Sequence, residues 1–150
     1  MKARGWVVYM VAVTLVAQGR IMRTWSYQEL TDKADAVVIA KPLSTKDTEE
    51  KSVLPDISPN LPVVGLETEL EVRVVLKGEK SLKKITLHHY RLANASQPLI
   101  NGPMLISFDP QQYTRFLLFL HRDADGRYSP VSGQTDPAAF AVLKLEGSAQ

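Results

Sequence analysis

The residues whose types suggest chemistry are three histidines, His88, His89 and His121. Imidazole nitrogens bind zinc and other transition metals, and they exchange protons near neutral pH. His88 and His89 are adjacent in an expected strand, where neighbouring side chains point to opposite faces, so both cannot bind one ion without distortion. One hypothesis is a metal site made of one of them with His121 and an acid such as Asp109 or Asp136. The alternative is that one histidine of the pair lies in the core and the other in solvent.

Other chemical motifs in the chain are incomplete. The Asp-Ala-Asp-Gly run at 123–126 resembles the start of a calcium loop, but the later acidic ligands are missing, so we expect a hairpin turn. Ser132 lacks the glycine two residues before it that a hydrolase elbow requires. There is no cysteine and hence no thiol nucleophile. We therefore predict that the protein is not an enzyme and uses no cofactor.

The first 19 residues have the features of an export signal. Lys2 and Arg4 precede an apolar run at residues 6–17, and Ala17 and Gly19 provide small residues at a cleavage site. The run is shorter than the ~20 residues that span a bilayer. We predict cleavage after Gly19 and a secreted or periplasmic protein; an uncleaved N-terminal membrane anchor is the alternative.

The charge of the remaining chain bears on its partners. Lys2 and Arg4 are two of the 18 basic residues, so 16 basic side chains remain against 16 acidic ones. An exported chain without net positive charge is a poor candidate for phosphate contacts, and we predict no nucleic-acid partner. Because cysteine is absent, the fold depends on its hydrophobic core rather than on disulfides.

A long strand at residues 65–79 is the feature around which the other elements are arranged. Its apolar and polar residues alternate with period two, which indicates one buried and one wet face and a strand on each side. The predicted buried face consists of Leu66, Thr68, Leu70, Val72, Val74 and Leu76, and Glu67, Glu69 and Glu71 lie on the wet face.

Shorter elements precede and follow this strand. Ser26 and Glu29 have the spacing of a capping box, which predicts a helix from 26 to about 35. A first strand at 36–40 is expected to end at Pro42, followed by a long exposed loop at 43–64 and a second loop at 93–103. The other predicted elements are strands at 85–92, 104–108, 115–121 and 127–131 and a C-terminal helix at 136–147. A strand is the alternative for this last element.

These elements predict a mainly β fold. Because the connections are too short for crossovers, the strands should be antiparallel, and closing the sheet would remove its edges. We expect a small Greek-key barrel of OB type, with five to six strands and a short helix at each end. The domain would cover residues 26–147, with a lead-in at 20–25 and a tail at 148–150.

Several runs in this order resemble the netrin-like module, the OB-fold domain of the tissue inhibitors of metalloproteinases and of several bacterial exported proteins. They are Lys-Ala-Asp-Ala-Val-Val-Ile-Ala-Lys at 33–41, Val-Leu-Lys-Gly at 75–78, residues 113–120, and Asp-Gly-Arg-Tyr at 125–128. The resemblance covers most of the mature chain. The inhibitors bind the protease zinc through an N-terminal Cys-x-Cys, whereas this chain has no cysteine and has Asn101-Gly102 where a Cys-Gly is expected. No inhibitory residue carries over.

We therefore expect an exported, non-enzymatic binding module that contacts a protein or a cell-envelope component through the loops at 43–64 and 93–103. One alternative is a metal-binding protein or metal-dependent enzyme that uses the histidines. Another is a structural subunit of an envelope assembly, which would have an exposed apolar patch. The candidate partner-binding residues are Asp47, Asp56, Asn60, Asn94 and Asn101.

Overall fold

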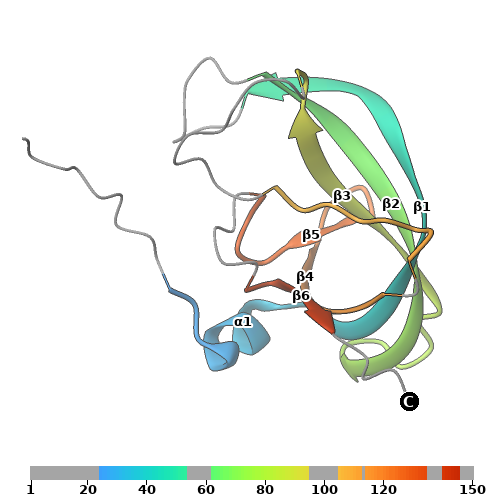
Figure 1. Ribbon diagram of the computed structural model, residues 1–150. Coiled ribbons are helices and arrows are strands. Elements are labelled where there is room, and N and C mark those ends of the chain that lie inside the picture. Colours follow the sequence, from blue (N-terminus) through green and yellow to red (C-terminus); the bar gives the residue numbers. More distant parts are fainter. Residues whose placement is uncertain (1–23, 54–61, 95–104, 113, 135–139, 146–150) are drawn as a thin grey trace, which may run out of the picture.

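The computed structural model describes residues 24–53, 62–94, 105–112, 114–134 and 140–145. Within them the fold is mainly β, with one short helix before the strands (Figure 1). The elements are α1 (Tyr27–Lys33), β1 (Ala36–Val53), β2 (Pro62–Lys77), β3 (Lys84–Leu92), β4 (Arg115–Arg122), β5 (Tyr128–Pro130) and β6 (Val142–Leu145). In these residues no helix is long and apolar enough to cross a membrane. The predicted export signal lies outside the described residues.

Five of the strands close into a ring. They pair in the order β1-β2-β3-β5-β4, β1 also pairs with β4, and β6 adds to the outer part of β4. All pairs are antiparallel except β3–β5, which is parallel and has one register position, Leu87 opposite Tyr128. The prediction that every pair is antiparallel is wrong here because the crossover argument holds only for strands that follow each other in the chain. Here β4 lies between β3 and β5 and provides the connection.

Helix α1 begins as the sequence predicts. The Ser26 hydroxyl accepts a hydrogen bond from the Glu29 backbone N–H at 3.1 Å, and the Glu29 carboxylate accepts one from the Ser26 N–H at 3.1 Å. Both bonds satisfy backbone donors that have no partner inside the first helical turn. The buried Leu30 of this helix packs with Val37 and Phe119, so α1 covers the outer side of β1 and β4.

Strand β1 is much longer than predicted. The expected end at Pro42 and the expected loop from 43 are wrong, because residues 43–53 pair with β2 as far as Val53 opposite Pro62. Pro42 lies just beyond Ala40, the last residue of β1 that pairs with β4, so one edge of the strand is open where the proline falls. Residues 43–53 are largely exposed on both faces, which leaves no hydrophobic alternation to reveal a strand. Residues 54–61 lie outside the described part.

Strand β2 has partners on both sides, β1 and β3, as predicted. The alternation holds through Val72 and then fails. Ile39 of β1 pairs with Val74 and Ala40 pairs with Val72, so Arg73 is an extra residue that reverses the alternation. Val74 and Leu76, which were predicted to be buried, are 45% and 54% exposed. They form a small apolar patch on the outer face of the sheet.

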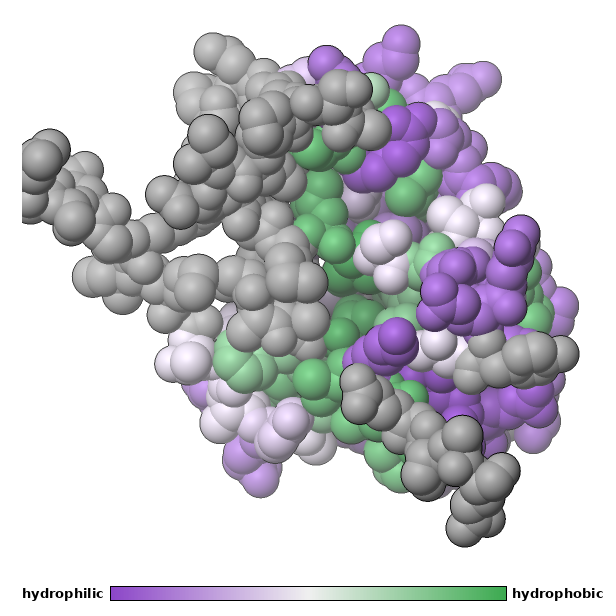
Figure 2. All heavy atoms as spheres, in the orientation of Figure 1, coloured by the Kyte–Doolittle hydropathy of each residue, from purple (hydrophilic) through white to green (hydrophobic). Residues whose placement is uncertain are grey.

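The hydrophobic core has two parts. Inside the ring, Leu118 and Leu120 pack with Val38, Leu70 and Leu87. On the other side of β4, Phe119 lies under α1. This arrangement confirms that β4 is apolar on both faces because both are covered. Figure 2 shows hydrophobic residues along the middle of the visible face, with hydrophilic residues beside them.

Two elements predicted in the C-terminal half of the chain, the strand at 104–108 and the helix at 136–147, are wrong. Residues 105–112, which we call the strap, do not form the expected strand at 104–108, and only Leu105 makes an isolated bridge. The apolar residues of the strap instead pack on the core: the Phe108 ring lies 4.9 Å from that of Phe116. The described part of the predicted C-terminal helix contains β6, which pairs with β4 at 115–118, so the strand alternative is correct there.

Candidate functional site

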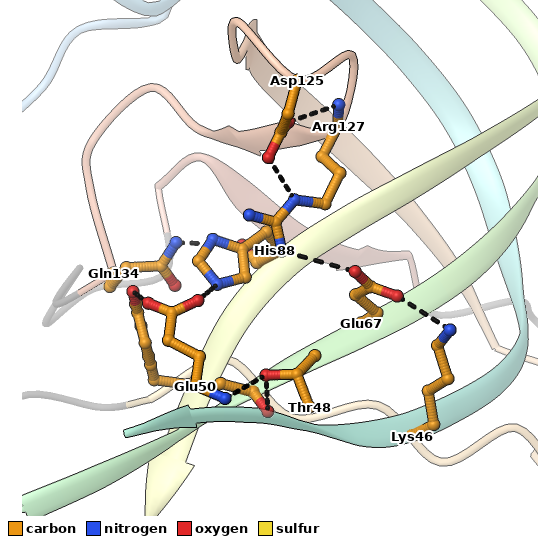
Figure 3. Close-up of polar contacts among 10 residues, drawn as sticks. Lys46, Thr48, Glu50, Glu67, His88, Asp125, Arg127 and Gln134 are labelled. Carbon is orange, nitrogen blue, oxygen red and sulfur yellow. Dashed lines mark hydrogen bonds and ion pairs between the residues drawn. The ribbon is translucent and has the colours of Figure 1, made fainter. Parts of the chain in front are cut away.

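Polar side chains from three strands gather on the outer face of the β1–β2–β3 sheet. Leu87 and His89 point into the ring, so His88 and Tyr90, their neighbours on β3, lie outside, as does Glu67 of β2. The turn between β4 and β5 and the residues after β5 lie over the same face (Figure 3). We call this set the outer cluster; it consists of Lys46, Thr48, Glu50, Glu67, His88, Tyr90, Asp125, Arg127 and Gln134.

Glu50 is the centre of one half of the outer cluster. One carboxylate oxygen accepts a hydrogen bond from the Tyr90 hydroxyl, and the other lies 2.9 Å from His88 Nε2, which donates to it. The bond from Tyr90 lowers the pKa of Glu50. Burial, followed by the bond to Glu50, raises the pKa of Tyr90 to about 12. Near neutral pH the carboxylate is therefore ionised and the phenol protonated, so the pair forms a fixed acceptor and donor.

Gly65 allows Glu50 to reach across the sheet. A Cβ at Gly65 would lie 2.6 Å from the Thr48 hydroxyl oxygen and 3.1 Å from Glu50 Cβ. The Thr48 hydroxyl donates to the Gly65 carbonyl at 3.0 Å and accepts from the Glu50 N–H at 3.2 Å. The irregular part of β1 between Asp47 and Lys51 thus folds over a position that has no side chain.

We expect Gly65→Ala to lower the free energy of unfolding by about 1–3 kcal/mol, because the added methyl overlaps Thr48 and Glu50. The measurement is chemical denaturation. The double variant Gly65→Ala/Thr48→Ala should recover part of the loss, since it removes the closest contact. A Gly65→Ala protein as stable as the original would show that Glu50 does not depend on this glycine.

Arg127 is the centre of the other half of the outer cluster. Its guanidinium contacts Asp125 in its own hairpin, with Nε 2.7 Å from Oδ2, and Glu67 on β2, with Nη1 3.3 Å from Oε1. Glu67 also pairs with Lys46 at 2.9 Å, and these cations lower its pKa. Lys46 is exposed, so its contribution to stability is small. The arginine is only partly exposed, and it joins the β4–β5 hairpin to the sheet across β3.

His89 lies on the inner side of β3 and is fully buried, as one of the two alternatives for the histidine pair predicts. Its Nδ1 is 3.0 Å from the Ile106 carbonyl oxygen of the strap, and its Nε2 is 2.8 Å from the Thr68 hydroxyl. A carbonyl only accepts, so Nδ1 carries the proton and Nε2 accepts from Thr68. Burial lowers the pKa of His89 to about 4, and the ring is neutral. His88 is mostly buried against Glu50 rather than solvated.

The residues proposed as metal ligands are not brought together. His121 is exposed at another part of the molecule, where Nδ1 lies 2.7 Å from Asp35 Oδ2. The Asp109 carboxylate accepts from the Gln111 backbone N–H at 2.9 Å, and Asp136 lies outside the described residues. Within the described ranges, no group of three histidines and acids could hold a metal ion.

Of the predicted partner-binding residues, Asp47 and Asn94 can be placed. Both are exposed, and the Asp47 carboxylate accepts from Arg91, with Nε 3.1 Å from Oδ1. The positions of Asp56, Asn60 and Asn101 lie outside the described part. The sequence pattern could place His88 and Tyr90 on one face, but it gave no sign of Glu50, because Glu50 lies in a strand that resembles a loop.

No protein-family model matches the sequence, and no curated protein matches it.

Proposed function

We propose that the protein is an exported, non-enzymatic binding module that contacts a protein or a cell-envelope component through the outer cluster and the adjoining pair Asp47–Arg91. The observation that carries the proposal is that these polar side chains are held in place by one another on strands. Glu50 is held by His88 and Tyr90, and Asp47 by Arg91. A polar surface that is already ordered loses little side-chain entropy when a partner binds.

The chemistry of the outer cluster supports binding rather than catalysis. The Glu50 and Glu67 carboxylates each have two bonded partners, and these bonds lower the pKa values of both, which makes each a weaker base toward a substrate. The Tyr90 phenol stays protonated, since its pKa is about 12. His89 is buried under the strap, away from solvent. Groups arranged in this way can recognise a complementary polar surface.

The finer fold assignment is part of this proposal. Five strands that close into a ring, with one parallel pair between β3 and β5, support an OB-type Greek-key frame. The run at 33–41 spans the end of α1 and the first third of β1, and the run at 75–78 covers the end of β2. The resemblance to the netrin-like module therefore falls on elements that such a frame would share. A fold alone does not assign a partner.

The test is a capture experiment with the chain from residue 20, applied to the extracytoplasmic fraction of the source organism. Residues 43–53 belong to β1, so deleting them would disrupt the sheet, and charge reversal is the sharper change. Arg91→Glu is expected to lose the partner, because it turns the Asp47–Arg91 pair into a repulsive one. Arg73→Glu, at an exposed position of β2, is the matched control and should retain it.

A second candidate function, a structural subunit of an envelope assembly, is favoured by the exposed Val74 and Leu76. The same experiment separates the two: a partner lost with Leu76→Ser and kept with Arg91→Glu would favour the subunit. If neither substitution changes what is captured, or if nothing is captured, the proposal for the outer cluster is wrong.

A further inference from the structure

The ring wall is incomplete between β3 and the β4–β5 hairpin. These strands pair only where Leu87 lies opposite Tyr128, and beyond that pair, toward Lys84, a hollow of about 380 Å³ opens. A second hollow of about 460 Å³ adjoins it on the side of Asp35 and His121. The first hollow is lined by residues 84–86 of β3 on one side and by Arg122, Gly126 and Tyr128 on the other. Glu79, Arg122 and Tyr128 line both hollows. The space therefore lies between a strand edge and a hairpin.

Most charged side chains around the hollows already have a hydrogen-bond partner. Lys84 pairs with Glu69. The Asp35 carboxylate accepts from the Arg122 backbone N–H at 2.8 Å and from His121, and the Asp123 carboxylate accepts from Ser129 at 2.9 Å. These bonds leave few groups at the hollows that a bound molecule could satisfy.

Two donors in the shared wall remain available. Arg122 is exposed and lies opposite Tyr128 in the β4–β5 pair, and among the described residues its guanidinium and the Tyr128 hydroxyl have no hydrogen-bond or ion-pair partner. Glu79 accepts from Ser81, and in the described part of the chain no cation pairs with its carboxylate. A guanidinium beside a hydroxyl suits a carboxylate, because the planar fork donates two parallel bonds to its oxygens. The neighbouring Glu79 suits a positive charge on the same molecule.

The strand edge gives the bound molecule a second means of attachment. Residues 84–86 of β3 pair with β2 on one side, and no described strand pairs with them on the side of the hollow. An extended peptide can pair its backbone with such an edge. The hairpin that forms the opposite wall is held by Arg127, which joins Asp125 to Glu67, so the hollow has two fixed sides (Figure 3).

We propose that this hollow binds an extended peptide that has a free C-terminal carboxylate and a basic side chain near it. The carboxylate accepts from the Arg122 guanidinium and the Tyr128 hydroxyl, the basic side chain lies near Glu79, and the backbone pairs with the edge of β3. The peptide is either a short free one or the C-terminal tail of a protein. This site lies outside the outer cluster.

The experiment is calorimetric titration of the full chain with acetyl-Val-Lys-Val, either as the free acid or as the C-terminal amide. The free acid is expected to bind about tenfold to a hundredfold more tightly than the amide, because bonds between charged groups are lost in the amide. Arg122→Gln should weaken binding of the acid by the same factor. Arg115→Gln, the same change at an exposed position of the same strand, should leave it unaltered.

Three outcomes would overturn the proposal. They are equal affinity for acid and amide, equal effects of the two arginine substitutions, and no binding of the acid at millimolar concentration. With labelled protein, binding should also shift the backbone amide signals of residues 84–86; saturable binding without these shifts would exclude pairing with β3.

Two further arms identify the source of the peptide and separate this proposal from the proposed function. Appending Val-Lys-Val to the C-terminus of an inert carrier protein should preserve binding if the natural partner is a protein tail. Binding of the free peptide alone would assign a short peptide, with the same role for Arg122. Arg91→Glu should not change the peptide affinity, so failure of one proposal leaves the other standing.

Discussion

Lowering the pH from 6.5 to 4 is expected to reduce the free energy of unfolding by about 3 kcal/mol through His89 alone. The unfolded chain takes up a proton at His89 near pH 6.5, whereas the buried ring resists protonation until about pH 4. The unfolded state therefore binds more protons throughout this window. The stability that the neutral ring provides is fully present above pH 6.5 and is lost as the pH falls, at about 1.4 kcal/mol per pH unit.

The measurement is urea denaturation at several pH values above about 5. There the carboxylates with lowered pKa values, such as Glu50 and Asp35, contribute little to the slope, because their unfolded values are 4.5 and 3.8. His89→Gln should abolish most of the slope, whatever it does to the stability at neutral pH. His121→Gln, at the exposed histidine, should retain it. A slope that survives His89→Gln would assign the acid sensitivity to other groups.

Truncation of Leu118 is the substitution with the largest expected cost. Leu118 is fully buried in β4, where it pairs with Val38 of β1 and Val142 of β6. Leu118→Ala should lower the free energy of unfolding by about 2–5 kcal/mol, because the ring is closed around the site and the space left cannot collapse freely. The change can be measured by chemical denaturation at neutral pH.

Leu76→Ala is the matched control for this truncation. The alternation of the sequence places Leu76 on the buried face of β2, but the extra residue Arg73 turns it outward. We therefore expect Leu76→Ala to lower the free energy of unfolding by less than about 0.5 kcal/mol. Equal losses from the two truncations would mean that the reversal at Arg73 is absent in solution and that the simple alternation is correct.

The comparison of these leucines shows what a sequence pattern can predict. Where one face of a strand is buried and the other wet, as from Leu66 to Val72, the alternation defines the strand and its inner face. The run of β4 was recognisable because both its faces are apolar. A bulge is not visible in the pattern, since it depends on how two strands align, and so the exposure of Leu76 was mispredicted.

The long second half of β1 shows where such prediction fails. Residues 43–53 contain no apolar alternation because neither face is buried, and their polar composition resembles that of a loop. The outer cluster was missed for the same reason. Its histidine and tyrosine could be placed on one face of β3, but Glu50 reaches them only because β1 extends beyond Pro42 and Gly65 leaves space.

Closure of the ring also affects how the chain folds. β1 pairs with β2, which follows it, but its other edge pairs with β4, so that Ala36 lies opposite Leu120. Contacts between residues so distant in sequence form only after a large loss of chain entropy, and proteins dominated by them fold in milliseconds to seconds. Until β4 arrives, the inner faces of β1, β2 and β3 are open to water and to other chains. We therefore expect the docking of β4 to limit the folding rate and to cover the apolar faces through which partly folded chains could aggregate.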